Sequence, residues 1–129
     1  MQVTDLDYHT FSLNQELEVL DLSNNNLTFQ PMPHWNSNKQ LKEVDFSNNH
    51  INITELPLEW TSTIWLKLEK LNLSRNFIGE TLRIEDFNWR QSTGIKVDLS
   101  RNRIKRIEFQ VYMHDEWNFL AFEFGNTTH

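Results

Sequence analysis

The stretch from Leu17 to Leu27, LEVLDLSNNNL, recurs three more times in this chain of 129 residues. The other copies read LKEVDFSNNHI from Leu41, LEKLNLSRNFI from Leu68 and, with glycine in the first apolar position, GIKVDLSRNRI from Gly94. Counted from the second apolar position of each copy, the steps are 24, 27 and 26 residues. A constant internal pattern at this period indicates structural repeats that stack on one another.

Each copy predicts one short strand, because it carries two apolar residues two positions apart, the spacing of side chains on one face of a strand. These pairs are Leu20 and Leu22, Val44 and Phe46, Leu71 and Leu73, and Val97 and Leu99. A lone strand cannot bury its apolar face, so neighbouring repeats are expected to lie side by side in one parallel sheet. Phe122 and Phe124 follow 25 residues beyond the last pair and predict a fifth, degraded copy.

An asparagine occupies the same place in each full copy, directly after the strand: Asn25, Asn49, Asn76 and Asn102. An amide side chain both donates and accepts hydrogen bonds. We therefore expect a structural asparagine ladder that satisfies backbone groups of its own turn and of the next one.

The predicted fold is a leucine-rich repeat solenoid: an open arc with one parallel β-sheet on its concave face and irregular or short helical convex segments. The whole chain, 1–129, is interpreted as a single segment with a partial repeat at 1–16, repeats from about 17, 41, 68 and 94, and a degraded repeat from about 119. It begins and ends within a repeat and has no cysteines, so we interpret it as an uncapped interior part of a longer solenoid. The aromatic side chains expected to fill the core from the convex side are Trp35, Trp60, Trp65, Phe87, Trp89 and Trp117.

Composition argues against several classes of function. A net charge of −6 disfavours nucleic-acid binding, and no window approaches the 18 apolar residues of a membrane span. The five histidines never form a metal-ligand pair, and three glycines supply no phosphate-binding loop. The sequence therefore predicts a protein that is not an enzyme, with no cofactor, metal site, nucleic-acid partner or membrane contact within this segment.

The remaining candidate is a surface. Residues between and after the buried positions should stack in columns about 4.8 Å apart on the concave face. One column is acidic, and its neighbour across the turn carries arginine. The candidate ligand-binding residues are Asp21, Asp45, Asp98, Glu123, Arg75 and Arg101. An acidic column either consists of solvated polar positions or attracts a basic protein ligand.

Four Asn-x-Ser/Thr sequons begin at Asn26, Asn52, Asn72 and Asn126 and predict N-glycosylation of a secreted or cell-surface protein. Asn72 should lie in the middle of the concave sheet. A glycan there would obstruct this face and direct a partner to the lateral edge that carries Asn24, Asn48, Arg75 and Arg101.

The L-x-x-L-x-L-S-x-N signature resembles that of extracellular leucine-rich repeat proteins of animals. The run IKVDLSRNRIKRIEF, followed by a short phenylalanine-rich strand, further resembles the ectodomains of arthropod Toll receptors. The resemblance implies a protein-recognition segment of a Toll-like receptor in innate immune or developmental signalling, on the extracellular side of the plasma membrane. It also implies a protein ligand such as a cystine-knot cytokine, and receptor self-association. The alternatives are a secreted or matrix adhesion or scaffold protein and, third, a cytosolic repeat adaptor.

Overall fold

The computed structural model describes residues 10–28, 37–54, 67–85, 95–110 and 120–123; for 84–85, 109–110 and 120–123 it describes the backbone alone. Within these ranges the chain forms strands and turns and no helix. The strands are β1 (Val19–Asp21), β2 (Glu43–Asp45), β3 (Lys70–Asn72), β4 (Gly79–Glu85), β5 (Ile95–Asp98), β6 (Arg103–Gln110) and β7 (Leu120–Glu123).

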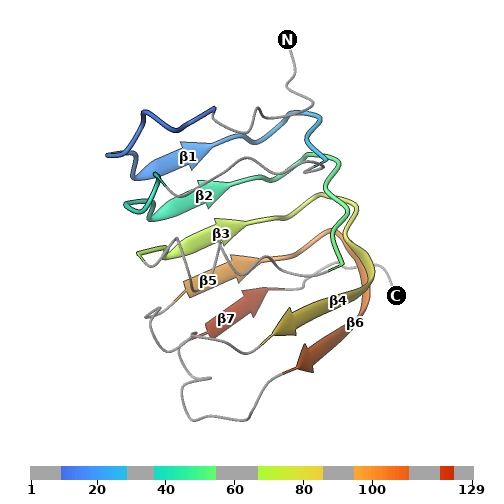
Figure 1. Cartoon of the computed structure of the whole chain (residues 1–129). Coiled ribbons are helices and arrows are strands. Elements are labelled where there is room, and N and C mark those ends of the chain that lie inside the picture. The colour runs from blue at the N-terminus through green and yellow to red at the C-terminus, as the bar shows by residue number, and fades with distance from the viewer. Residues whose placement is uncertain (1–9, 29–36, 55–66, 86–94, 111–119, 124–129) are drawn as a thin grey trace.

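Five of these strands form one sheet in the order β1-β2-β3-β5-β7, and each pairs in parallel with its neighbours. Figure 1 shows them stacked from one end of the molecule to the other, with each repeat adding one strand. The register aligns Leu20, Val44, Leu71, Val97 and Phe122 in one row. The predicted parallel sheet is therefore confirmed, including the fifth strand of the degraded copy.

The core lies behind this sheet. In the three-residue strands β1, β2 and β3, the central residue is buried while its two flanking residues are exposed or half-buried. A second row of core residues stands two positions after the ladder asparagine. Its members are Leu27, Ile51, Ile78 and Ile104, all at most 4% exposed. Each repeat thus contributes side chains to one continuous apolar cluster.

Asn76 shows how the inward turns are held. Its side-chain amide donates to the carbonyls of Leu73 and Ser74 in its own turn and of Phe46 in the preceding repeat, at 3.0–3.1 Å. Its Oδ1 accepts from the backbone N–H groups of Asn49 and Ile51 at 3.2 and 3.0 Å. The partners outside its own turn belong to the preceding repeat, whereas the sequence analysis placed them in the next one.

Asn49 and Asn102 repeat this arrangement. Asn49 donates to the carbonyl of Leu22 and accepts from the N–H of Leu27, and Asn102 donates to Leu73 and accepts from Ile78. Both side chains are 2% exposed. Because buried amide groups are stable only when they are hydrogen-bonded, this position admits few other side chains.

A second sheet was not anticipated. β4 and β6 pair in parallel on the return side of two successive repeats, with a register shift between Glu80 and Thr81, and Figure 1 shows them apart from the five-stranded sheet. The prediction of irregular or short helical convex segments is therefore wrong for Gly79–Glu85 and Arg103–Gln110. At the start of this pair, a Cβ on Gly79 would lie 2.8 Å from the carbonyl oxygen of Arg103, so the close strand approach requires glycine.

All six aromatic residues expected to fill the core from the convex side lie outside the described residues. The curvature of the arc and the division of the chain into repeats stay predictions. In the described part of the chain, no helix is long and apolar enough to cross a membrane.

Candidate recognition surface

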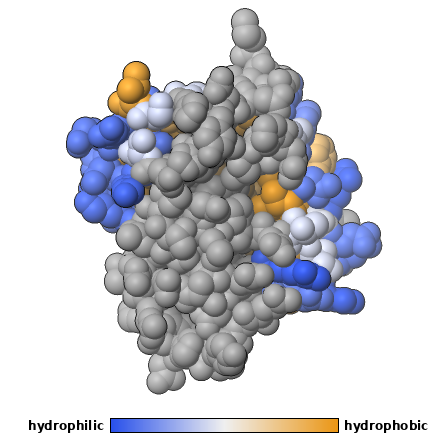
Figure 2. Space-filling view, in the orientation of Figure 1, coloured by the Kyte–Doolittle hydropathy of each residue, from blue (hydrophilic) through white to orange (hydrophobic). Residues whose placement is uncertain are grey.

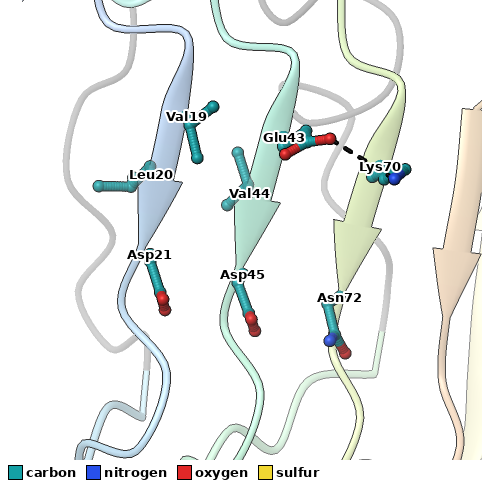
Figure 3. Close-up of a pocket in the computed structure, with 8 residues that line it drawn as sticks. All are labelled: Val19, Leu20, Asp21, Glu43, Val44, Asp45, Lys70 and Asn72. Carbon is teal, nitrogen blue, oxygen red and sulfur yellow. Dashed lines mark ion pairs between the residues drawn. The ribbon is translucent and has the colours of Figure 1, made fainter.

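The exposed face of the five-stranded sheet carries the predicted acidic column. Asp21, Asp45 and Asn72 occupy the same register position on β1, β2 and β3, and Figure 3 shows their side chains in a row on one side of the strands. Asp98 continues the row on β5. Glu123 of β7 pairs with Asp98 through its backbone, and its side chain lies outside the described residues.

Each described member of this column also has a local structural role. One side-chain oxygen of Asp21, Asp45, Asn72 and Asp98 accepts the backbone N–H of the serine two residues later, at 2.9 Å in every case. This is the hydrogen bond that aspartate and asparagine side chains use to close turns. These residues therefore close the turn at the end of each strand. The second oxygen of each carboxylate takes no part in this turn hydrogen bond.

Asp21 shows the electrostatic consequence. The hydroxyl and the backbone N–H of Ser23 both donate hydrogen bonds to the carboxylate of Asp21. These bonds lower the pKa of Asp21 below its ordinary value. Because the pKa of Asp21 is lower in the folded state, these hydrogen bonds stabilise the fold at neutral pH, and their contribution is lost as the pH falls through that pKa.

Ion pairs between neighbouring repeats cross the amino-terminal side of the same face. Lys42 Nζ lies 2.9 Å from a carboxylate oxygen of Glu18, and Lys70 Nζ lies 3.5 Å from Glu43. The hydrogen bond and charge of Lys42 lower the pKa of Glu18, and Glu18 in turn raises the pKa of Lys42. The Glu43–Lys70 pair borders a shallow hollow of about 270 Å³ over β1, β2 and β3 (Figure 3).

The predicted lateral edge follows the acidic column by three residues. Asn24, Asn48, Arg75 and Arg101 all have left-handed backbone conformations, with φ between 55° and 60°. The backbone N–H groups of Asn24, Asn48 and Arg75 donate to the carbonyl of a serine in the next repeat at 3.0 Å. Asparagine tolerates this conformation, whereas arginine adopts it at a cost.

Replacing Arg101 with asparagine is expected to raise the free energy of unfolding by about 0.5–1 kcal/mol, because asparagine relieves part of the left-handed strain. The reverse substitution Asn48→Arg should lower it by a similar amount. Urea unfolding monitored by circular dichroism measures both. An Arg101→Asn variant that is less stable than the parent chain would contradict the strain assigned to this position.

A stack of three side chains beyond this edge was missed in the sequence analysis. The ring centroids of His50 and Phe77 are 5.3 Å apart, and the guanidinium carbon of Arg103 lies 4.8 Å from the centroid of Phe77. The three residues hold equivalent positions in successive repeats, so extending the column analysis by two positions would have revealed them. Figure 2 shows that the described surface in this view is mostly hydrophilic, with only small separate apolar patches.

The predicted glycosylation sites differ in their surroundings. Asn52 is exposed, Asn26 and Asn72 are half-buried, and Asn126 lies outside the described residues. Oδ1 of Asn72 accepts the N–H of its own sequon residue Ser74, which is only 8% exposed. Among the described side chains, no group of three or more His, Cys, Asp or Glu residues is placed to hold a metal ion.

Comparison with protein families identifies repeats in two stretches of the chain. The family described as Leucine Rich repeats (2 copies) matches residues 15–60, which include β1 and β2, and the family described as Leucine Rich Repeat matches residues 67–88, which include β3 and β4. No curated protein and no solved structure matches the chain. The chain therefore contains leucine-rich repeats, and the matched stretches supply β1, β2 and β3 of the five-stranded parallel sheet.

Proposed function

We propose that this chain is a protein-recognition segment whose partner docks on the exposed face of the five-stranded sheet and on the edge that follows it. The observation that carries the proposal is the strict register of the repeats, which places equivalent exposed side chains in continuous columns across neighbouring strands. Leucine-rich repeats are typically non-enzymatic modules for protein interaction. A stacked surface of this kind offers a partner many contacts without an internal catalytic pocket.

At a finer level, we propose the ectodomain of a Toll-like cell-surface receptor that binds a protein ligand, such as a cystine-knot cytokine, and associates with a second receptor chain. The support is the resemblance of the repeats and the presence of sequons, of which Asn52 is exposed. The secreted adhesion protein and the cytosolic adaptor remain alternatives. The flanking sequence of the natural protein distinguishes them, because a receptor requires a signal peptide, a membrane span and a cytoplasmic signalling domain, whereas a secreted protein requires the signal peptide alone.

Site-specific photo-crosslinking in cells that produce the natural protein tests the general proposal. Benzoylphenylalanine replaces Val19, which is 57% exposed on the sheet face, or Arg101 on the edge, and the control position is Leu13, which is 92% exposed outside the sheet. We expect at least one of the first two positions to give a discrete adduct with a single partner protein. Adducts that are absent, or equally strong from Leu13, would contradict a recognition role for this surface.

A further inference from the structure

We propose that the edge formed by Arg75, Phe77, Arg101 and Arg103, here called the basic edge, docks an acidic polypeptide segment that also carries apolar side chains. This inference rests on the proposed role in protein recognition. It assigns that role to one surface and one partner chemistry, and it differs from the expectation of a basic ligand on the acidic column.

Charge compensation separates the basic edge from five other cations among the described residues. These five lysine and arginine side chains pair with carboxylates: Lys42 with Glu18, Lys70 with Glu43, Arg83 and Arg106 with Glu108, and Lys105 with Glu80. Lys67 instead donates a hydrogen bond to the side-chain oxygen of Gln40. Arg75, Arg101 and Arg103 are exposed, and none of them forms an ion pair within the described ranges. Three uncompensated guanidinium groups therefore gather on one edge of a chain whose net charge is −6.

The backbone fixes where these groups emerge. Arg75 and Arg101 occupy equivalent left-handed positions in adjacent repeats, and the N–H of Arg75 donates to the carbonyl of Ser100 at 3.0 Å. Their Cα atoms therefore follow the spacing of adjacent strands, about 5 Å. Guanidinium groups bind carboxylates through paired, charge-assisted hydrogen bonds. Two such groups at a fixed spacing suit successive acidic side chains of one bound segment.

Phe77 supplies the apolar part of the surface. It is 41% exposed although it is a large hydrophobic residue. It lies between His50 and Arg103 in the order of the repeats, and both contact its ring. Beside it is a hollow of about 330 Å³, which is also lined by Asn52, Gly79, Glu80, Arg103 and Lys105. An aliphatic or aromatic side chain of the partner can enter this hollow and pack against the ring.

The same contacts favour a polypeptide over a sulfated polysaccharide. Both would supply anions for the arginines. A sugar ring, however, gains most by stacking on an open aromatic face, and the guanidinium of Arg103 already lies over the ring of Phe77. An apolar side chain next to an acidic residue in a polypeptide can instead pack against the part of the Phe77 ring that remains exposed.

Fluorescence anisotropy with defined probes tests the proposal on the full 129-residue chain produced in bacteria, which lacks N-glycans. The probes are a labelled peptide of repeating Glu-Leu-Glu-Phe units, its Lys-Leu-Lys-Phe counterpart, a Glu-Gly-Glu-Ser counterpart without apolar side chains, and heparin as a competitor. We expect the Glu-Leu-Glu-Phe peptide to bind at least about tenfold tighter than the other two peptides, because only this peptide carries both acidic groups for the arginines and apolar side chains for the ring of Phe77.

Each double variant replaces residues with those found at the equivalent positions of other repeats, so that the charge changes while the backbone conformation is kept. In R75N/R101N the arginines become asparagine, as at Asn24 and Asn48, so the backbone conformation is favoured while two charges are lost. In D45N/D98N the aspartates become asparagine, as at Asn72, which makes the same turn hydrogen bond. We expect about tenfold weaker binding of the Glu-Leu-Glu-Phe peptide to R75N/R101N and a change within about twofold for D45N/D98N. Phe77→Ala should weaken binding of this peptide and leave that of the Glu-Gly-Glu-Ser peptide unchanged.

Unchanged affinity in R75N/R101N, or tighter binding of the Lys-Leu-Lys-Phe peptide that depends on Asp45 and Asp98, would overturn the proposal and favour the acidic column. Heparin that outcompetes the peptide with no effect of Phe77→Ala would show a polysaccharide or general anion surface instead. In either case, specific photo-crosslinks in the natural protein would still support protein recognition, whereas their absence would remove that function itself.

A glycan on Asn52 would stand beside the hollow, so chain from a secretory host should bind more weakly than its Asn52→Gln variant if that site is occupied.

Discussion

Replacing Asn76 with alanine is expected to lower the free energy of unfolding by about 3–5 kcal/mol, the largest effect of any single substitution considered for this chain. The carbonyls of Phe46, Leu73 and Ser74 keep one other hydrogen bond each, from Asn49, Asn102 and Asn48. The N–H groups of Asn49 and Ile51 lose the acceptor Oδ1 of Asn76. Both residues are at most 2% exposed, and each buried donor without a partner costs about 1–3 kcal/mol.

Asn52→Ala is the matched control, because the same chemical change occurs at an exposed asparagine on the neighbouring repeat. Its effect should stay within about 0.5 kcal/mol. Equilibrium unfolding in urea measures both variants. If Asn76→Ala costs less than about 1 kcal/mol, the hydrogen bonds between repeats are not the stabilising contacts that the structure indicates.

Truncating Leu71 to alanine is expected to cost about 2–5 kcal/mol. Leu71 is 1% exposed on the third of five strands and is paired in register with Val44 on one side and Val97 on the other. Removing its side chain leaves a cavity within the continuous core, and flanking strands that are hydrogen-bonded in place can close it only in part.

Val19→Ala provides the comparison for Leu71→Ala, because Val19 is an aliphatic residue on β1 that is 57% exposed. Its cost should stay below about 0.5 kcal/mol. Thermal unfolding followed by circular dichroism reports both. Equal destabilisation by the two substitutions would mean that the core does not lie behind the sheet as described.

The sequence was sufficient to predict the sheet because the repeats carry the same information several times. Leu20, Val44 and Leu71 are the buried centres of β1, β2 and β3, and Val97 is a buried residue of β5. The strands were expected to extend to the second apolar residue, such as Leu22. They end one residue earlier, because the turn closed by Asp21 begins there.

The second sheet was not predicted because the segments between strands differ in length and sequence from one repeat to the next. The stretches GETLRIE and RIKRIEFQ contain only two β-branched residues each, which is a weak signal for strands. Their pairing depends on the close approach of Gly79 and Arg103, which a pattern within one repeat cannot reveal.

The candidate surface was predicted in part. Column positions follow directly from the repeat, so Asp45, Asp98, Arg75 and Arg101 could be assigned to neighbouring rows from the sequence. The turn hydrogen bonds of the aspartates and the left-handed conformation of the arginines depend on backbone geometry. Ligand binding by these residues stays a prediction, as do Glu123 and Asn126 as functional residues.

Nuclear Overhauser contacts between β2 and β3 test the central claim, that the repeats stack their strands in parallel and thereby build one exposed surface. In an isotope-labelled sample, the account predicts contacts between the backbone protons of Glu43 and Lys70 and between those of Asp45 and Asn72. Contacts of Glu43 with Asn72 and of Asp45 with Lys70 would show antiparallel strands. That result would contradict the stacked repeats, the aligned columns and the basic edge together.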